Sequence, residues 1–577
     1  MIKRWKIKEP APAEVVERLS KEINANSVVA NLLYHRGITT YDEAKLFFRP
    51  LLEHLHDPFM MKDMDKAVAR IEKAISAGEK ILVYGDYDVD GTTAVALVYS
   101  FLTSKFSSLT SQFSFYIPDR YKEGYGISTA GIDFAAANNF SLIIALDCGI
   151  KSVDKIAYAQ EKGIDFIICD HHLPGEKIPN AYAVLDPKRK DCQYPYKELS
   201  GCGIGFKLIQ ALAQKKNIPT GELEQYLDLV AISIAADIVP ITGENRILAF
   251  YGMKRLNNSP REGIRAMLEL ANMKKELTIT DVVFVIGPRI NAAGRMESGN
   301  KAVELLISSS SHHAIESGNY LNKNNSERRD LDIYTTQQAL AMIAESATLQ
   351  QKKTTVLFDP SWHKGVIGIV ASRLTETYYR PTVMLTQSNG IVSGSARSVK
   401  DFDLYEAISA CSDLLEQFGG HKFAAGLTLK PENVEAFKIK FEEVVSATIT
   451  DDMLVPEIEI DAAIGLQDIT PGFYNILKQF APFGPGNMNP VFLTENVADK
   501  GYANIVGSNH LKMNLTSPLG GGKPAAGEAK FPAIGFGLAE HYEFVAKKNP
   551  FTVCYNIREQ EWEGKTYLQL QVKDLKK

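Results

Sequence analysis

The sequence predicts an α/β protein in which a parallel-sheet domain, a long connecting helix and a smaller α/β domain are followed by a C-terminal β-barrel. Short apolar runs alternate with amphipathic stretches between residues 80 and 185, which is typical of a parallel sheet covered on both faces by helices. A polar helical stretch follows at 312–350. Residues 451–577 alternate short strands with one helix, which suits a small barrel of OB type.

Composition narrows the class of protein. The 577 residues allow about three or four domains, and 45% hydrophobic with 23% charged residues is ordinary for a globular protein. A net charge of −5 excludes a uniformly basic nucleic-acid coat, although it allows a local basic groove. The six scattered cysteines form no C-x-x-C pair, so neither a zinc ribbon nor a disulfide framework is indicated.

No targeting or membrane segment is expected. The opening MIKRWKIKEP lacks the apolar core of a secretion signal. The longest apolar runs are far shorter than the ~20 residues of a membrane helix. We therefore expect a soluble, cytoplasmic protein that makes no contact with a membrane.

The first eighty residues carry helical periodicity, at 12–23, 41–48 and 64–76. The strands expected next span residues 80–84, 113–117, 141–146, 165–169 and 181–185. The second α/β unit has strands at 354–358, 382–385 and 390–393 and a helix at 366–377. The barrel region has a helix at 471–480 and strands at 491–494, 510–515, 533–537, 551–557 and 566–572.

Acidic residues follow the first of these strands in the pattern D-x-D-x-D-G, residues 86–91. This spacing also opens a calcium-binding EF-hand loop. An EF-hand needs a helix before the loop and a glutamate at loop position twelve. Here a β-type run precedes, and position twelve is Leu97, so the calcium interpretation fails.

The same pattern recurs at other segment ends. Asp147 follows the strand at 141–146, Asp170-His171-His172 follows the strand at 165–169, and Asp237 ends an apolar helix. Ligands of open parallel sheets lie beyond the carboxyl ends of the strands. Carboxylates with histidine and no thiolate suit Mg²⁺ or Mn²⁺ better than zinc. Two such ions would activate water and stabilise the leaving oxygen of a phosphodiester.

The glycine-rich run 201–205 invites comparison with a dinucleotide-binding fingerprint. It lacks the G-x-G-x-x-G spacing and follows no strong strand, so this interpretation is disfavoured.

A set of motifs identifies the chain as similar to the DHH phosphoesterase superfamily, named for Asp170-His171-His172. Within it, the chain resembles the RecJ family of single-strand-specific DNA exonucleases. The motifs are YGDYDVDGTT (84–93), IPDRYKEGYGIS (117–128), LDCG (146–149), DHH (170–172), LSGCGIGFKL (199–208), AADIVP (235–240), GPRINAAGRM (287–296), WHKGVIGIVASRL (362–374), SGSARS (393–398), GGHKFAAG (419–426) and PFGPGN (482–487).

The resemblance implies four regions and two divalent metal ions, Mn²⁺ or Mg²⁺. Residues 1–311 would be an N-terminal helical segment plus the DHH catalytic domain, 312–350 the connecting helix, 351–450 a DHHA1 domain and 451–577 an OB-fold DNA-binding domain. The implied metal ligands are Asp88, Asp90, Asp147, His171 and Asp237. The implied further catalytic residues are Asp86, Asp170 and His172.

Their implied roles differ. Asp147 would bridge the ions, Asp86 and Asp170 would orient ligands, and His172 would face the scissile phosphate. Some superfamily members have a metal-binding histidine where this chain has Tyr84. The first ion would then have one protein ligand fewer, completed by water.

The DHHA1 domain is implied to grip substrate phosphate. The implied phosphate-binding residues are Arg120, Arg289, Arg295, Ser395, Arg397 and His421. Arginine offers a two-pronged donor, and the glycines beside His421 let backbone N–H groups approach an anion. The alternative for each arginine is a surface salt bridge.

The function implied is 5′-to-3′ degradation of single-stranded DNA to 5′ mononucleotides in repair and recombination. An alternative is a DHH-type phosphodiesterase acting on oligoribonucleotides or cyclic dinucleotides, and a further one is an inactive DNA-binding scaffold. The resemblance also implies a monomer whose partners are a single-strand-binding protein and a RecQ-type helicase.

Overall fold

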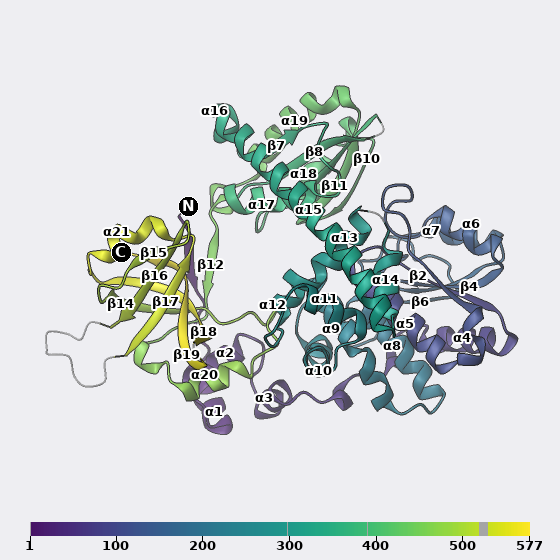
Figure 1. Ribbon diagram of the computed structural model, residues 1–577, viewed down its shortest axis with the longest axis horizontal. Helices are drawn as coiled ribbons and strands as arrows, with labels where there is room; N and C mark the ends of the chain where they lie inside the picture. Colours follow the sequence, from purple (N-terminus) through teal and green to yellow (C-terminus); the bar gives the residue numbers. More distant parts are fainter. Residues whose placement is uncertain (1, 297, 389, 518–528, 563) are drawn as a thin grey trace. The chain divides into compact units, whose positions relative to one another are not determined.

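The computed structural model describes residues 2–296, 298–388, 390–517, 529–562 and 564–577. These form two compact units. One comprises Leu52–Val455, and the other combines Met1–Leu51 with Pro456–Lys577. The expected α/β architecture with a parallel sheet, a connecting helix, a second α/β domain and a barrel is confirmed (Figure 1).

The first domain of the larger unit is built on a five-stranded parallel sheet of order β3-β2-β4-β5-β6. Its strands are β2 (Lys80–Gly85), β3 (Phe113–Tyr116), β4 (Phe140–Leu146), β5 (Asp165–Cys169) and β6 (Ala183–Leu185). Alternate residues of the central strands face opposite layers. Ile81 and Ile144 lie in the core shared with one set of helices, whereas Leu82 and Ile143 lie in the core on the other side.

The helices of this domain cover both faces of the sheet. Those packed on the Ile81 side include α4 (Met64–Ala77), α5 (Val89–Lys105), α8 (Gly201–Lys215) and α9 (Leu227–Ala236). Those on the Leu82 side are α6 (Thr129–Ala137) and α7 (Val153–Glu161). The domain continues through α10 (Gly243–Asn258), α11 (Glu262–Leu270), α12 (Ile279–Asp281), α13 (Gly287–Met296) and α14 (Asn300–Ile307).

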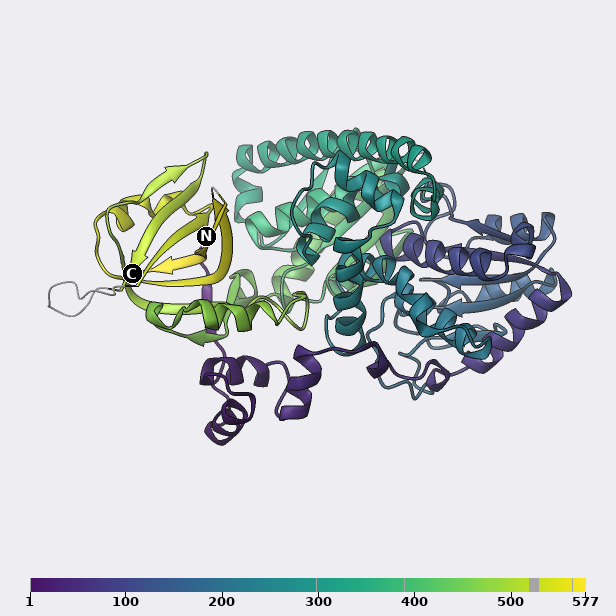
Figure 2. The same cartoon turned by 60° about the horizontal axis from the view of Figure 1, so that its bottom comes forward.

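The connecting helix is α15 (Ser311–Glu345), followed by the short α16 (Ala347–Gln351). It packs on α11, α13 and α14 of the first domain and on α17 of the second, so both domains contact the same long helix (Figure 2). The second domain has a sheet of order β10-β11-β9-β8-β7. Its elements are β7 (Thr355–Phe358), α17 (Ile367–Tyr378), β8 (Thr382–Ser388), β9 (Ile391–Arg397), α18 (Leu404–Ser409), β10 (Gln417–His421), β11 (Ala424–Leu429) and α19 (Val434–Thr448).

The barrel of the smaller unit is closed because strand β14 (Phe492–Asp499) pairs with both β18 (Phe551–Trp562) and β16 (His510–Thr516). Its elements are β13 (Ala462–Ala463), α20 (Pro471–Lys478), β14 (Phe492–Asp499), β15 (Asn504–Val506), β16 (His510–Thr516), β17 (Lys530–Phe536), α21 (Tyr542–Ala546), β18 (Phe551–Trp562) and β19 (Lys565–Lys576). All five strands expected from the sequence are present, and β18 and β19 extend beyond their apolar runs as a long hairpin.

The N-terminal segment belongs to this barrel unit, which differs from the division drawn from the sequence. Strand β1 (Arg4–Ile7) pairs in parallel with β12 (Glu457–Ile460). Helices α1 (Ala13–Ile23), α2 (Ser27–Tyr34) and α3 (Tyr41–Phe48) bury residues such as Leu19 and Leu33 in one core with Leu477 and Phe480. Helical periodicity shows which face of a helix is apolar, but not which distant segment covers it.

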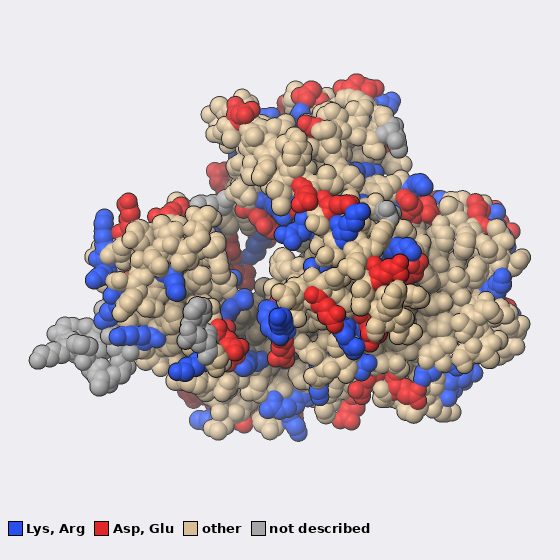
Figure 3. Space-filling view, in the orientation of Figure 1, with Lys and Arg blue, Asp and Glu red and all other residues tan. Residues whose placement is uncertain are grey.

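Surface charge is mixed. On the face drawn in Figure 3, acidic and basic side chains are interspersed, as the small net charge predicts. Within the described residues, no helix combines the length and the apolar character required to cross a bilayer.

Candidate metal centre

The carboxyl edge of the parallel sheet gathers the acidic residues that follow its strands. Asp86 lies directly after β2, Asp147 after β4, and Asp170 after β5. Asp90 lies in the first turn of α5, and Asp237 at the end of α9. Segments distant in sequence therefore deliver their carboxylates to one edge because parallel strands end side by side.

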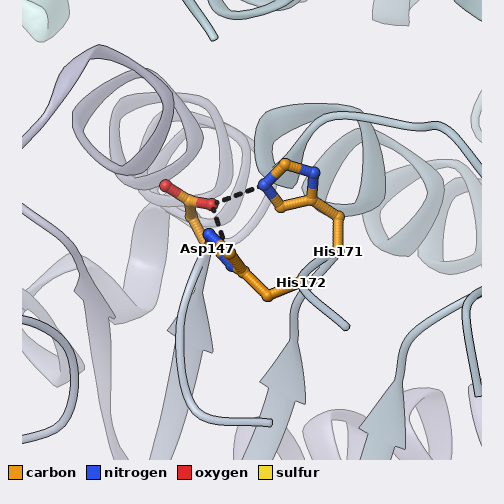
Figure 4. A group of neighbouring side chains, drawn as sticks. All are labelled: Asp147, His171 and His172. Atoms are coloured by element: carbon orange, nitrogen blue, oxygen red, sulfur yellow. Dashed lines mark ion pairs between the residues drawn. The ribbon is translucent and has the colours of Figure 1, made fainter. Parts of the chain in front are cut away.

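His171 is at the centre of this group. Its Nε2 lies 3.2 Å from Asp147 Oδ1, 3.6 Å from Asp237 Oδ2 and 3.8 Å from Asp90 Oδ2. In Figure 4, the imidazoles of His171 and His172 approach one oxygen of Asp147 from two sides; His172 Nδ1 is 4.0 Å from it. Three carboxylates thus converge on one imidazole nitrogen.

The donor set fits a divalent cation. Asp147 Oδ1, Asp86 Oδ2 and both ring nitrogens of His171 are buried and have no hydrogen-bond partner. Such atoms are costly unless something pairs with them. Potential ligand atoms lie within 4.8 Å of one another in two groups: Asp147 with His171 and His172, and Asp90 with His171 and Asp237. Carboxylate and imidazole ligands of this kind suit Mn²⁺ or Mg²⁺.

Two predicted residues stand differently from the expected assignment. His172 belongs to the first ligand group, whereas the resemblance implied only that it would face the scissile phosphate. Asp88 belongs to neither group. Its Oδ1 caps α5 by accepting a hydrogen bond from Gly91 N at 3.0 Å.

Asp90 is held by donors that the sequence did not single out. Its carboxylate accepts hydrogen bonds from Gly201 N and Cys202 N, and from Ser233 Oγ, all at 2.7 Å. The first turn of α8 therefore binds a carboxylate of the protein itself. A Cβ on Gly201 would lie 2.6 Å from Asp147 Cβ, so only glycine fits there. The glycine-rich run 201–205 packs against Asp90 and Asp147 of the metal centre, so it is not a dinucleotide-binding site.

Asp170 orients the side chain of His172. It accepts hydrogen bonds from Ile150 N at 2.9 Å and from His172 Nδ1 at 2.7 Å. Burial alone would raise the pKa of Asp170, but the hydrogen bond and charge of His172 outweigh it and lower that pKa to about 2. Burial opposes protonation of His172, yet Asp170 raises its pKa to about 9. Tyr125 Oη lies 3.2 Å from Nε2 of His172.

Three family models match the chain. They are the DHH family N-terminal domain over residues 80–234, the DHHA1 domain over 351–447 and the RecJ OB domain over 460–574. The single-stranded-DNA-specific exonuclease RecJ of Bacillus subtilis is 37% identical over 99% of this chain and 70% of its own length. That of Escherichia coli is 33% identical over 88% and 90%. The chain belongs to the RecJ family.

Solved RecJ structures carry the expected metals. Thermus thermophilus RecJ in complex with Mn²⁺ matches with a TM-score of 0.83 and 27% identity, over all of this chain and 79% of that one. The same protein in complex with Mg²⁺ matches with a TM-score of 0.77 and 26% identity, over 100% and 78%. The prediction of Mn²⁺ or Mg²⁺ as cofactor is therefore supported for this RecJ-family chain by both its relatives and its donor set.

Tyr84, the position that the resemblance compares with a histidine ligand of some superfamily members, is turned away from the metal centre. It is buried in the opposite core layer and stacks on Tyr116. Its hydroxyl donates to Gly126 O at 2.9 Å and accepts from Ser128 N at 3.2 Å. The hydroxyl is thus satisfied by the loop at 126–128 and is not a ligand.

Three further carboxylates of the centre have raised pKa values when no cation is bound. Burial, followed by the charges of Asp90 and Asp88, raises the pKa of Asp147 well above its usual value. Burial and the same neighbours raise that of Asp237 to about 8. Asp86 is raised in the same direction by burial and Asp88. Each group titrates near pH 4 in an unfolded chain.

These shifts predict a pH-dependent metal effect on stability. Between about pH 4 and 8 the metal-free folded chain binds more protons than the unfolded chain, so its stability falls as pH rises. Metal binding requires the deprotonated forms and removes this penalty. With a chelator, Tm should fall from pH 6 to pH 8, and Mn²⁺ should raise Tm more at pH 8 than at pH 6. Equal Mn²⁺ effects at both pH values would contradict this explanation.

The predicted phosphate-binding residues divide into two sets, because Arg289 has different partners from the other five. Those five are Arg120, Arg295, Ser395, Arg397 and His421. Arg397 Nε lies 3.1 Å from Ser372 Oγ, and an Arg397 terminal nitrogen lies 3.2 Å from Ser395 Oγ. Ser395 and Arg397 share one face of strand β9, which continues past the strand expected at 390–393. Arg295 donates to Gly365 O of the DHHA1 domain at 3.1 Å. Burial, then the charges of neighbouring arginines including Arg120 and Arg397, lowers its pKa to about 10.

Within the described ranges, Arg120, Arg295 and Arg397 form no ion pair with an acidic side chain, so the salt-bridge alternative does not describe them. The nearby charge of Arg397 also contributes to lowering the pKa of His421, after burial. Arg289 is held elsewhere. Its guanidinium donates to Val285 O at 2.7 Å and to Asn322 Oδ1 at 3.2 Å.

Proposed function

We propose that this protein is a metal-dependent exonuclease that degrades single-stranded DNA from the 5′ end and releases 5′ mononucleotides, in DNA repair and recombination. The observation that carries the proposal is the convergence of Asp90, Asp147 and Asp237 on His171, with buried atoms that lack partners, in a member of a family whose named relatives are single-stranded-DNA-specific exonucleases.

Each residue of the centre has a role in this proposal. The carboxylates of the two ligand groups, with His171, would hold two divalent ions, which would supply an activated water and stabilise the charge that develops on the phosphate. His171 is common to both groups, and Asp147, whose Oδ1 lies 3.2 Å from His171 Nε2, would be the carboxylate that bridges the ions. Ser233 and the N–H groups of α8 hold Asp90 in place. His172, oriented by the hydrogen bond of its Nδ1 to Asp170, would face the scissile phosphate with its half-exposed ring.

The polymer substrate is favoured over a dinucleotide by the C-terminal barrel. A phosphodiesterase for oligoribonucleotides or cyclic dinucleotides needs only the DHH and DHHA1 domains. A match to the RecJ OB domain over residues 460–574 supports a surface that holds additional nucleotides of a long strand.

The proposal is tested with the purified protein and strands labelled at the 5′ or the 3′ end, in Mn²⁺, Mg²⁺ or chelator. We expect labelled mononucleotide at once from 5′-labelled DNA, and progressively shorter fragments from 3′-labelled DNA. Mononucleotide release from the 3′-labelled end first would reverse the direction, and cleavage of dinucleotides alone would favour the alternative. A monomeric state, a cytoplasmic location and work alongside a single-strand-binding protein and a RecQ-type helicase stay predictions.

Arg397 is expected to recognise the end of the strand. Like Arg120 and Arg295, it forms no ion pair with an acidic side chain in the part of the chain that the structure describes, and charge-assisted hydrogen bonds contribute about 1.5–3 kcal/mol each. Arg397→Ala should therefore raise KM by about 10-fold or more for 5′-phosphorylated strands, and less for 5′-hydroxyl strands, while kcat is largely kept. Arg289→Ala is the matched control, since its guanidinium is bound to Asn322 and Val285. Equal losses on both strand types would exclude the end-recognition role.

A further inference from the structure

The turn after α9 has a backbone conformation that its residue type disfavours. Asp237 ends the helix with φ −82°, and Ile238 follows at φ +59°. Of the eleven non-glycine residues at positive φ in the described part of the chain, eight are Asn or Asp, and Ile238 alone is branched at Cβ. Branching at Cβ crowds the backbone in this region, so isoleucine is strained where Gly or Asn would not be.

The protein gains little burial in return. The Ile238 residue is 63% exposed, so its side chain is not held by the core. The turn itself is required because it places Asp237 beside His171 and returns the chain to the buried Val239. Asn at position 238 would make the same turn at lower cost. Strain without compensation inside the fold points to a partner outside it.

The position of Ile238 indicates which partner this is. Consecutive Cα atoms are 3.8 Å apart, so Ile238 is adjacent to a residue whose carboxylate lies 3.6 Å from His171 Nε2. A second apolar residue, Leu173, is 69% exposed and directly follows His172. Two exposed aliphatic side chains thus border a centre made of carboxylates and imidazoles. A nucleotide bound there would place its phosphate at the centre and its apolar base beside it.

We infer that Ile238 contacts the nucleobase beside the scissile phosphate, and that its backbone strain is retained for this contact. The inference rests on the proposed function. Apolar contact with a base face does not depend on base identity, which suits an enzyme that removes nucleotides of any sequence. Because the contact exists before and during cleavage, it lowers KM more than it raises kcat.

Three variants of the full-length protein distinguish a contact between Ile238 and the substrate from an effect of Ile238 on the stability of the protein. Ile238→Asn removes the apolar side chain and relieves the strain, so we expect Tm to rise by about 1–2 °C and KM for single-stranded DNA to rise about 3–10-fold. Ile238→Leu keeps an aliphatic side chain without branching at Cβ and should restore KM. Ile439→Asn removes another exposed isoleucine, 59% exposed on α19, and should leave KM unchanged.

A substrate change identifies the base as the partner. Strands with an abasic site at the first or second nucleotide should have a raised KM with wild-type protein, and no further increase with Ile238→Asn, because both changes remove the same contact. Additive effects would exclude a base contact. An unchanged KM or a lowered Tm in Ile238→Asn would overturn the inference.

The failure of the proposed function would be recognised separately. If wild-type protein does not hydrolyse single-stranded DNA, the proposed function fails, whereas strand binding in chelator, measured by fluorescence anisotropy, still compares Ile238→Asn with wild type and with Ile439→Asn. Weaker binding by Ile238→Asn alone supports the contact, and equal binding by all three proteins excludes it.

Discussion

Asp147→Asn is expected to abolish hydrolysis of single-stranded DNA. Asp147 Oδ1 is buried, has no hydrogen-bond partner and lies 3.2 Å from Nε2 of His171, the residue common to both ligand groups, so we propose that it serves both ions. Asparagine has the same shape and tolerates the φ of +59° at this position, so the backbone is preserved. The loss should exceed the ~10–100-fold typical of a carboxylate that only orients ligands.

Asp86→Asn is the matched control, because Asp86 is equally buried on the same sheet edge but belongs to neither ligand group. It should retain measurable single-turnover activity. Folding of Asp147→Asn can be checked independently: with one carboxylate fewer in the centre, its Tm in chelator at pH 8 should be at least that of wild type. Activity of Asp147→Asn close to that of wild type would exclude a shared metal ligand.

Removal of the barrel unit should weaken binding to long strands by about 10–100-fold, while cleavage of very short oligonucleotides is partly kept. The protein to use is residues 52–455, which form a compact unit of their own. If the barrel unit contributes stacking and charge along the strand, as we propose, the affinity lost should depend on salt. Equal losses on dinucleotides and on long strands would show instead that this unit supports the catalytic domain.

A truncation of the C-terminal residues alone is the informative comparison. It removes Leu477 and Phe480 and leaves Leu19 and Leu33 on α1 and α2 without the core that buries them. We expect this protein to aggregate or to unfold at a lower temperature than residues 52–455.

The parallel sheet could be predicted from the sequence because its strands are buried on both faces and therefore read as continuous apolar runs, as in β4. The residues after these strands could be predicted with it, since parallel topology alone brings Asp86, Asp147 and Asp170 to one edge. The local sequence pattern was sufficient to predict those elements whose burial is visible in their own residues.

Other features depend on contacts that no local pattern contains. Ser233 lies in a predominantly apolar helix, and its hydroxyl is significant only because α8 and α5 bring Ser200 and Asp90 within hydrogen-bond distance. An N-cap serine before a glycine-rich helix was the available signal, at Ser200. The hairpin of β10 and β11 was missed since its glycines suggested an anion-binding loop. Arg289 matches a motif, yet one of its partners, Asn322, lies on the distant helix α15.

The pairing of β1 with β12 has a consequence for how the chain is made. About 450 residues separate the two strands, so a ribosome adding 5–20 residues per second reaches β12 on the order of a minute after β1. During that interval α1 and α2 present apolar faces without their final cover. This unit can therefore complete its fold only after translation of residues 456–577, whereas residues 52–455 can fold earlier, and N-terminal residues are the part of the nascent protein most dependent on chaperones.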